Sequence, residues 1–266
     1  MPGPGLSPFE LALAGLAAVA AGAVNAIAGG GTLITFPTLT ALGLPVVAAN
    51  VTNTLAVAPG ALGGLVALRR ELAGQGPRLA RLTPAALLGG LVGGYLLLHT
   101  NEALFRRLVP WLILGASALL AVQDPLRTFL LRRLAGTNGA ADGAPHGRLG
   151  EVVATLLVFC GAVYGGYFGA GLGVIVLAVL GLVLHDSLTR LNAIKQAIGF
   201  AANLAGALLF AAFGPVHWPA AAVMAVGAIA GGVVGGRFAS RIRASTLRTL
   251  VVATGTIVGL IYLIRG

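Results

Sequence analysis

Charge is scarce in this chain: only 9% of its 266 residues are Asp, Glu, Lys or Arg, whereas 58% are hydrophobic. A water-soluble domain carries roughly 25% charged residues. The mean hydropathy of +0.96 also exceeds what a water-exposed surface tolerates. These values argue against a soluble enzyme, a disordered chain and a collagen-like chain, and they indicate an integral membrane protein.

Cysteine and acidic residues are scarce as well. The single cysteine, Cys160, excludes an internal disulfide and a metal site built from several cysteines, and we interpret it as a packing residue. The seven acidic residues fall in loops or at the ends of apolar segments, so a buried carboxylate relay has no candidate. The four histidines are scattered, and neither a P-loop nor a nucleophile–base pair is present. The sequence therefore predicts no enzyme activity, no metal site and no cofactor.

Long apolar runs are what the chain has instead. About 20 apolar residues span a bilayer as a helix, and uninterrupted runs argue against a β-barrel, whose strands alternate apolar and polar residues. We therefore predict an all-α polytopic membrane protein with 8–10 transmembrane helices. Apolar segments are expected at residues 8–28, 31–44, 46–68, 83–99, 104–123, 151–169, 171–185, 188–213, 216–236 and 245–264.

Two of these segments, 31–44 and 171–185, are short for a hydrocarbon core of roughly 30 Å. They are candidates for partial or broken helices, and an arrangement of eight helices with two re-entrant pieces stays open. The first segment is not interpreted as a signal peptide, because no Lys or Arg precedes Arg69.

A polar stretch at 124–150 divides the chain into a first membrane repeat, 1–123, and a second, 151–266, and we interpret this stretch as a cytoplasmic linker. The two halves match in the order of their segment lengths. Five crossings per repeat is an odd number, so the second repeat would be inverted relative to the first. Inverted repeats are a frequent transporter architecture.

Sequence markers support the internal repeat. The glycine-rich stretch Gly89–Gly94 recurs as Gly231–Gly236, and Asn50 and Asn192 have the same spacing of 142 residues. Several markers at one spacing and in one order are the signature of a repeat.

The net charge of +10 comes from 17 basic and seven acidic residues. If the N-terminus lies outside and all ten segments cross, 13 of the basic residues fall in inside loops and three in outside loops. Such a bias sets membrane orientation. The positive charge is therefore no sign of a nucleic-acid partner, and none is expected.

The first motif with possible chemistry runs from Asn25 through three consecutive glycines, Gly29–Gly31, to Thr32. The glycines stand between two apolar segments, where they break a helix and expose the N–H groups that begin the next one. Helix N-termini attract anions through these donors and the helix dipole. Gly169 and Gly171 stand at the corresponding place in the second half. Tight helix packing or a plain turn is the alternative.

The second motif, Asn50 to Thr54, places four polar side chains within five residues at the start of the third segment. Polar groups in lipid are costly unless they are paired or face a cavity, so the cluster predicts a polar cavity. For Asn50, an N-cap is the alternative.

The third motif is Asn192, Lys195 and Gln196 in the second half. Asn192 and Lys195 are three residues apart and share a helix face. A charge inside an apolar segment is a functional-site hypothesis, so Lys195 is a candidate substrate contact. Its alternative is snorkelling to the headgroups. Asn203, near the same face, is a candidate contact or an interhelical hydrogen bond.

These motifs, together with Pro37, Phe168–Gly171, Gly214–Pro219 and Gly231–Arg237, resemble the sulfite exporter TauE/SafE family of bacterial inner-membrane transporters over nearly the full chain. The resemblance implies a multi-pass secondary transporter that moves sulfite or small organosulfonates, usually by export. One departure is in the second glycine turn, where the family often has a longer glycine run followed by proline. In this chain the residue of the second half that corresponds to Pro37 is Leu177. The two half-sites are therefore less symmetric.

We expect a small-anion site between the halves, in which backbone N–H groups of the two turns bind oxyanion oxygens, Lys195 supplies charge and the amides orient the substrate. The expected partners are the small anion, membrane lipid, a coupling ion (proton or sodium) and a second protomer in a homodimer. An anion channel and a non-transporting membrane scaffold are the alternatives. The candidate substrate-binding residues are Asn25, Gly29, Gly30, Gly31, Thr32, Asn50, Thr52, Asn53, Gly169, Gly171, Asn192, Lys195, Gln196 and Asn203.

Overall fold

The computed structural model describes residues 5–27, 30–135, 147–184, 186–238 and 244–265. This part of the chain is entirely helical, with eleven helices and no strand, which confirms the predicted all-α class. The helices are α1 (Pro8–Ile27), α2 (Thr32–Ala41), α3 (Val46–Ala67), α4 (Gly76–His99), α5 (Glu102–Ala121), α6 (Gln123–Ala135), α7 (Gly147–Tyr167), α8 (Leu172–Val183), α9 (Leu188–Phe213), α10 (Trp218–Phe238) and α11 (Ala244–Arg265).

Ten of the helices coincide with the ten expected apolar segments, and two differences have local causes. The helix α4 begins at Gly76 rather than at residue 83, because Pro77 occupies its first turn, where a missing N–H costs nothing. The helix α6 lies inside the expected linker. Leu130 of α6 is fully buried and packs against Gly181 of α8.

Among the described residues, seven helices are apolar and long enough to cross a membrane. They are Pro8–Asn25 in α1, α4, α5, Gly150–Tyr167 in α7, α9, Trp218–Gly235 in α10 and Ser245–Ile264 in α11. The apolar helices α2 and α8 have only 10 and 12 residues. At 1.5 Å per residue they reach roughly 15 and 18 Å, about half of a hydrocarbon core of roughly 30 Å. Neither can cross alone, as their short segments suggested.

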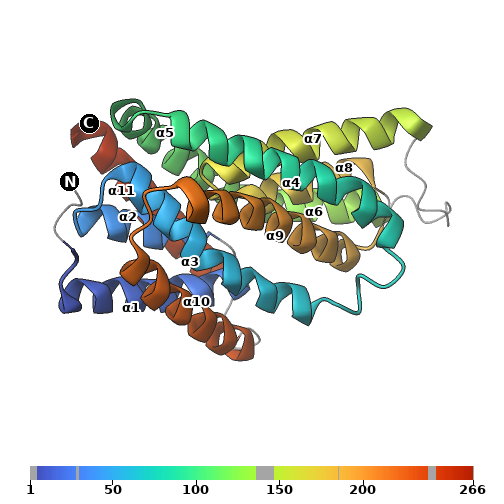
Figure 1. Ribbon diagram of the computed structural model, residues 1–266. Helices are drawn as coiled ribbons and strands as arrows, with labels where there is room; N and C mark the ends of the chain where they lie inside the picture. The colour runs from blue at the N-terminus through green and yellow to red at the C-terminus, as the bar shows by residue number, and fades with distance from the viewer. Residues whose placement is uncertain (1–4, 28–29, 136–146, 185, 239–243, 266) are drawn as a thin grey trace.

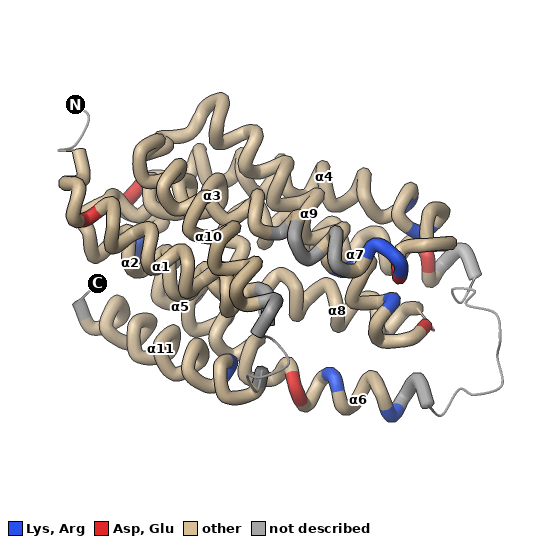
Figure 2. Tube along the Cα trace, turned by 90° about the horizontal axis from the view of Figure 1, so that it is seen from below, with Lys and Arg blue, Asp and Glu red and all other residues tan. Residues whose placement is uncertain are grey.

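The two short helices lie toward opposite ends of the bundle (Figures 1 and 2). Around them, α1 packs against α10, and α4 packs against α7 and α9. The helix α3 packs against α9 and α10, and α5 packs against α11. Each half of the chain therefore contributes helices to the packing of the other, so neither half forms a bundle of its own.

Glycines allow the closest helix contacts. A methyl group at Gly93 of α4 would lie 2.0 Å from the carbonyl oxygen of Val163 in α7. A methyl group at Gly231 of α10 would lie 1.9 Å from the carbonyl oxygen of Val19 in α1. Both distances are far below van der Waals contact, so only glycine permits this approach of the backbones.

Basic residues gather toward one end of the bundle, where α6 and the α3–α4 and α8–α9 connections lie (Figure 2). We call this the basic end. The α2–α3, α4–α5 and α9–α10 connections lie at the opposite end (Figure 1).

We expect Gly93→Ala to lower the free energy of unfolding by roughly 1–3 kcal/mol, because the added methyl group forces α4 away from α7. Thermal and denaturant unfolding of the purified protein in detergent would measure the change. The matched control is Gly115→Ala in α5, where a methyl group meets no atom within 4 Å. This control should be neutral or stabilising by up to about 1 kcal/mol. Equal losses in both variants would contradict the packing role of Gly93.

Candidate functional site

The first glycine turn joins α1 to α2. Gly30 has a positive φ of 92°, a conformation that favours glycine, and Gly31 is the N-cap of α2. The N–H of Gly31 donates to Oδ1 of Asn25 at 2.7 Å, so a side chain of α1 already occupies this donor. Thr32 is the first residue of α2, and Gly29 lies outside the described residues.

The second glycine turn joins α7 to α8 and contains two left-handed residues, Gly169 (φ 82°) and Gly171 (φ 81°). Gly171 is the N-cap of α8. The Tyr164 hydroxyl donates to the carbonyl oxygen of Ala170 at 2.7 Å and holds the turn against α7. Within the described part of the chain, the N–H groups of Gly171 and Gly173 donate to no acceptor. The start of α8 therefore has donors available to a ligand.

Lys195 of α9 lies beside this helix start. A methyl group at Gly173 would lie 3.9 Å from the Nζ atom of Lys195 and 3.8 Å from its Cδ atom. The side chain is half-buried, and among the described residues it has no hydrogen bond or ion pair. An ammonium group without a counter-ion thus stands next to the N-terminus of α8.

The polar cluster of α3 is buried, with Asn50, Thr52 and Asn53 at most 1% exposed. Nδ2 of Asn50 donates to the carbonyl oxygen of Tyr167 at 2.8 Å, and its Oδ1 has no partner in the described structure. Thr52 Oγ1 accepts from the N–H of His217 at 3.0 Å. Asn53 Oδ1 accepts from the hydroxyl of Thr35 in α2. The cluster thus connects α3 to three other parts of the chain.

The N-cap alternative for Asn50 is wrong, because α3 begins at Val46 and Asn50 lies inside the helix. The start of α3 is capped instead by the Glu102 carboxylate, which accepts from the N–H groups of Val46 and Val47. Sequence reasoning missed this cap, because its partners lie more than 50 residues apart and no local motif marks them.

The structure gathers part of the expected site around the second glycine turn. Asn50 is bonded to Tyr167 just before the turn, and a methyl group at Gly169 would lie 3.8 Å from Oδ1 of Asn203. Gly171 and Lys195 complete the group. Asn192 and Gln196 lie on the same helix as Lys195, are half-buried, and have no hydrogen bonds to other described side chains.

The remaining candidates, Asn25, Gly30, Gly31 and Thr32, lie at the first turn. Both turns pack against adjacent residues of α5. Leu120 lies beside Gly30, and Leu119 lies beside Gly171. In addition, Phe36 of α2 contacts Phe168 edge to face, with ring centroids 5.5 Å apart. The two helix starts therefore share one neighbourhood inside the bundle.

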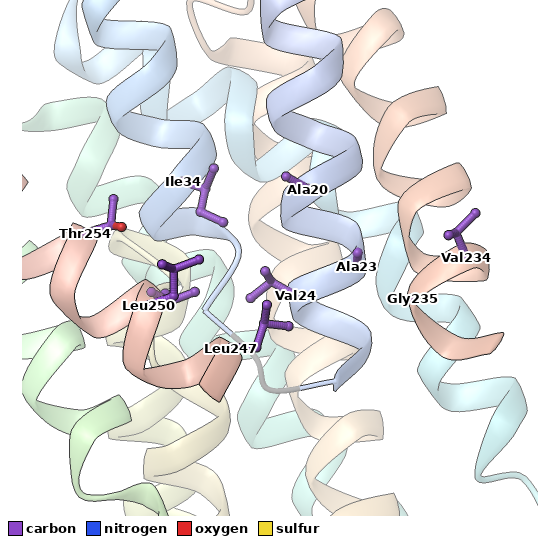
Figure 3. Close-up of a pocket in the computed structure, with 10 residues that line it drawn as sticks. Ala20, Ala23, Val24, Ile34, Val234, Gly235, Leu247, Leu250 and Thr254 are labelled. Carbon is purple, nitrogen blue, oxygen red and sulfur yellow. The ribbon is translucent and has the colours of Figure 1, made fainter. Parts of the chain in front are cut away.

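An apolar cavity of about 320 Å³ lies near the first turn, between α1, α2, α10 and α11 (Figure 3). Its lining includes Val24, Ile34, Leu247 and Leu250, and among the described lining residues only Thr254 has a polar side chain. The described lining carries no charged group and so lacks the donors that an anion needs, and we do not place the substrate here.

The helices and turns define a polytopic membrane protein built like a transporter, with helix starts broken at glycines in its interior. Residues 14–262 match the family described as sulfite exporter TauE/SafE. The chain therefore belongs to the sulfite exporter TauE/SafE family, which confirms the resemblance seen in the sequence.

Three relatives have similar names. The chain is 29% identical to a probable membrane transporter protein of Haemophilus influenzae, over 86% of this chain and 85% of the relative. It is 24% identical to the probable membrane transporter protein YfcA of Escherichia coli K12, over 95% of this chain and 89% of the relative. It is 27% identical to the probable membrane transporter protein ORF9 of a Sinorhizobium species, over 91% of this chain and 88% of the relative. No solved structure matches significantly. The protein is thus a bacterial multi-pass membrane transporter and not an enzyme.

We expect Asn50→Leu to lower the free energy of unfolding by roughly 1–3 kcal/mol, because the carbonyl group of Tyr167 loses its hydrogen bond to the buried Asn50 side chain. Denaturant unfolding in detergent would measure the loss. Asn203→Leu is the matched control, since Asn203 makes no side-chain hydrogen bond among the described residues and its replacement should cost much less. If the two variants unfold alike, the bond to Tyr167 does not stabilise the turn.

Proposed function

We propose that the protein is a secondary transporter that exports small anions, such as sulfite or organosulfonates, across the inner membrane. The observation that carries this proposal is the Lys195 ammonium group, which lies beside the start of α8 without a counter-ion among the described residues. The family and the named relatives support transport as the activity.

The chemistry at the start of α8 favours an anion. The helix dipole places partial positive charge at an N-terminus, and unpaired N–H groups there are donors for oxyanion oxygens. The N–H groups of Gly171 and Gly173 are such donors, and Lys195 adds a full positive charge next to them. Broken helices whose N-termini point at an anionic substrate recur in secondary transporters.

The two glycine turns are unequal, and this asymmetry favours the second as the main anion contact. At a spacing of 140 residues, Gly171 corresponds to Gly31, and Gly165 corresponds to Asn25. Asn25 occupies the N–H of Gly31, whereas Gly165 has no side chain that could occupy the N–H of Gly171. In this proposal the first turn and the amides of Asn53, Asn192 and Gln196 contribute to orientation, together with Thr52.

The packing supports the proposed inverted repeat. If α1 to α5 correspond to α7 to α11, a two-fold axis would exchange each helix with its counterpart. Every pair of helices packed between the repeats would then have a counterpart pair that is also packed, or would be its own counterpart. The pair of α1 with α10 then matches the pair of α7 with α4, and both occur. The α3–α9 and α5–α11 pairs are their own counterparts, and both occur as well. We propose that the basic end faces the cytoplasm, as the positive-inside rule requires.

We expect Lys195→Ala to lower the rate of sulfite transport in proteoliposomes at least tenfold, because a charge-assisted contact is worth about 1.5–3 kcal/mol. Sulfite, sulfate, thiosulfate, sulfoacetate and taurine should be screened first by thermal shift, since a ligand of the folded state raises its apparent stability. The shift produced by the best anion should disappear in Lys195→Ala.

Arg106→Ala is the control, because Arg106 is exposed near the start of α5, at the opposite end. It should bind and transport like the wild type. Wild-type transport by Lys195→Ala would remove this lysine from the mechanism. If no anion shifts the wild type and none is transported, the proposed substrate class is wrong.

A further inference from the structure

A group of charged and polar side chains joins the two halves of the chain at the basic end. Nη1 of Arg78, in α4, contacts Oδ2 of Asp186 at 2.5 Å, and Nε2 of Gln75 donates to the same oxygen at 3.1 Å. Nε of Arg190, in α9, lies 3.6 Å from Oδ1 of Asp186. We call these four residues the Asp186 cluster. It connects the α3–α4 connection of the first half to the α8–α9 connection of the second.

The Asp186 cluster is well enclosed and internally bonded. The Gln75 residue is 1% exposed, and the side chains of Asp186 and Arg78 are 13% and 20% exposed. Gln75 Oε1 also accepts from Arg78 at 2.9 Å. Burial opposes ionisation of Asp186, but hydrogen bonds from Gln75 and Arg78, the Ser187 N–H and the charge of Arg190 together lower its pKa below the ordinary value. The carboxylate is therefore charged at neutral pH, and the contacts are charge-assisted.

The opposite end is closed differently. There, among the described residues, the halves meet through neutral hydrogen bonds: the N–H of His217 donates to Thr52 Oγ1 at 3.0 Å, the hydroxyls of Thr40 and Tyr262 are hydrogen-bonded, and Thr100 Oγ1 lies 3.3 Å from the Tyr167 hydroxyl. No ion pair forms at that end among the described residues. Charge-assisted bonds are roughly twice as strong as neutral ones, so the two closures differ in strength.

The Asp186 cluster lies between Lys195 and the basic end. Asp186 precedes Lys195 by nine residues, and Arg190 precedes it by five along α9. At 1.5 Å per residue, Arg190 is roughly 8 Å from Lys195 along the axis of α9, and Asp186 lies beyond the start of that helix. An anion that enters from the basic end must therefore pass the level of this cluster to reach the lysine.

We propose that the Asp186 cluster is a latch that closes the basic end of the transporter and breaks when the Lys195 site opens toward that side. Transport through a fixed site requires a closed and an open state at each end. A latch made of charge-assisted bonds between the halves shifts this equilibrium toward the closed state. Its role rests on the proposed transport function, whereas its opening can be measured without any substrate.

A cysteine reporter beside Lys195 tests the latch. Cys160→Ser first removes the native cysteine, and Gly173→Cys then introduces the reporter thiol. A Cβ atom at Gly173 would lie 3.8 Å from its nearest neighbour, the side chain of Lys195, which is an ordinary van der Waals distance. Labelling of the reporter thiol by a membrane-impermeant maleimide is measured on inside-out vesicles without substrate. We expect Asp186→Asn to accelerate labelling by roughly tenfold, the factor that corresponds to loss of one charge-assisted contact.

Arg81→Gln is the matched control. Arg81 lies on α4 one turn after Arg78 and pairs with Glu151 across the same two halves, but its side chain is 60% exposed. Exposed pairs contribute little, so labelling should match the wild type. A charge exchange, Arg78→Asp with Asp186→Arg, should restore slow labelling.

Unchanged labelling in Asp186→Asn, or equal acceleration in Arg81→Gln, overturns the latch. If Asp186→Asn does not insert stably, Gln75→Leu tests the latch instead, because it removes one hydrogen bond to Asp186 and keeps every charge of the cluster. This variant should accelerate labelling by about threefold, half of the tenfold effect on a logarithmic scale, and no acceleration overturns the latch. If the proposed substrate class is wrong, the wild-type protein will bind none of the screened anions, but these labelling rates will not change.

Discussion

The fold depends on one constraint: backbone N–H and C=O groups buried in a membrane protein must find partners inside the protein. Nearly all of the described chain meets it by forming helices. At the two glycine turns the helical ladder is interrupted, and the exposed groups need other partners. Asn25 supplies one at the first turn, and Asn50 and Tyr164 supply others at the second. Within the described residues, the N–H groups of Gly171 and Gly173 have no such partner, and the proposed anion site lies at these unpaired donors.

Close backbone approach makes this interior possible. Gly93 and Gly231 bring α4 to α7 and α10 to α1 at distances that no larger residue allows. The two halves thereby share one packed interior, and the starts of α2 and α8 lie near the same turn of α5. The proposed transport cycle would then require the halves to move against each other. The ion pairs that join α4 to the second half place charge-assisted bonds between the parts that would move.

Much of the architecture could be predicted from local patterns. Continuous apolar runs predicted ten of the eleven helices, and glycines predicted both turns. Unpaired backbone groups are costly in lipid, so membrane segments form long apolar helices that are recognisable in the sequence. The helix α6 was missed because its composition is polar. It is stabilised by the burial of Leu130 and the ion pair of Asp124 with Arg248, which are tertiary contacts. The site was predicted as a set of residues, and its division between two unequal turns was not.

The sequence by itself determined the membrane class, the family, the broken helices and the presence of a lone lysine within an apolar segment, since each of these depends on composition or short spacing. Only the tertiary structure decided which groups meet. It placed Asn50 against a carbonyl 117 residues away and set Asp186 against Arg78. Hydrogen bonds act over about 3 Å, and only the packing of distant helices brings such atoms within that range.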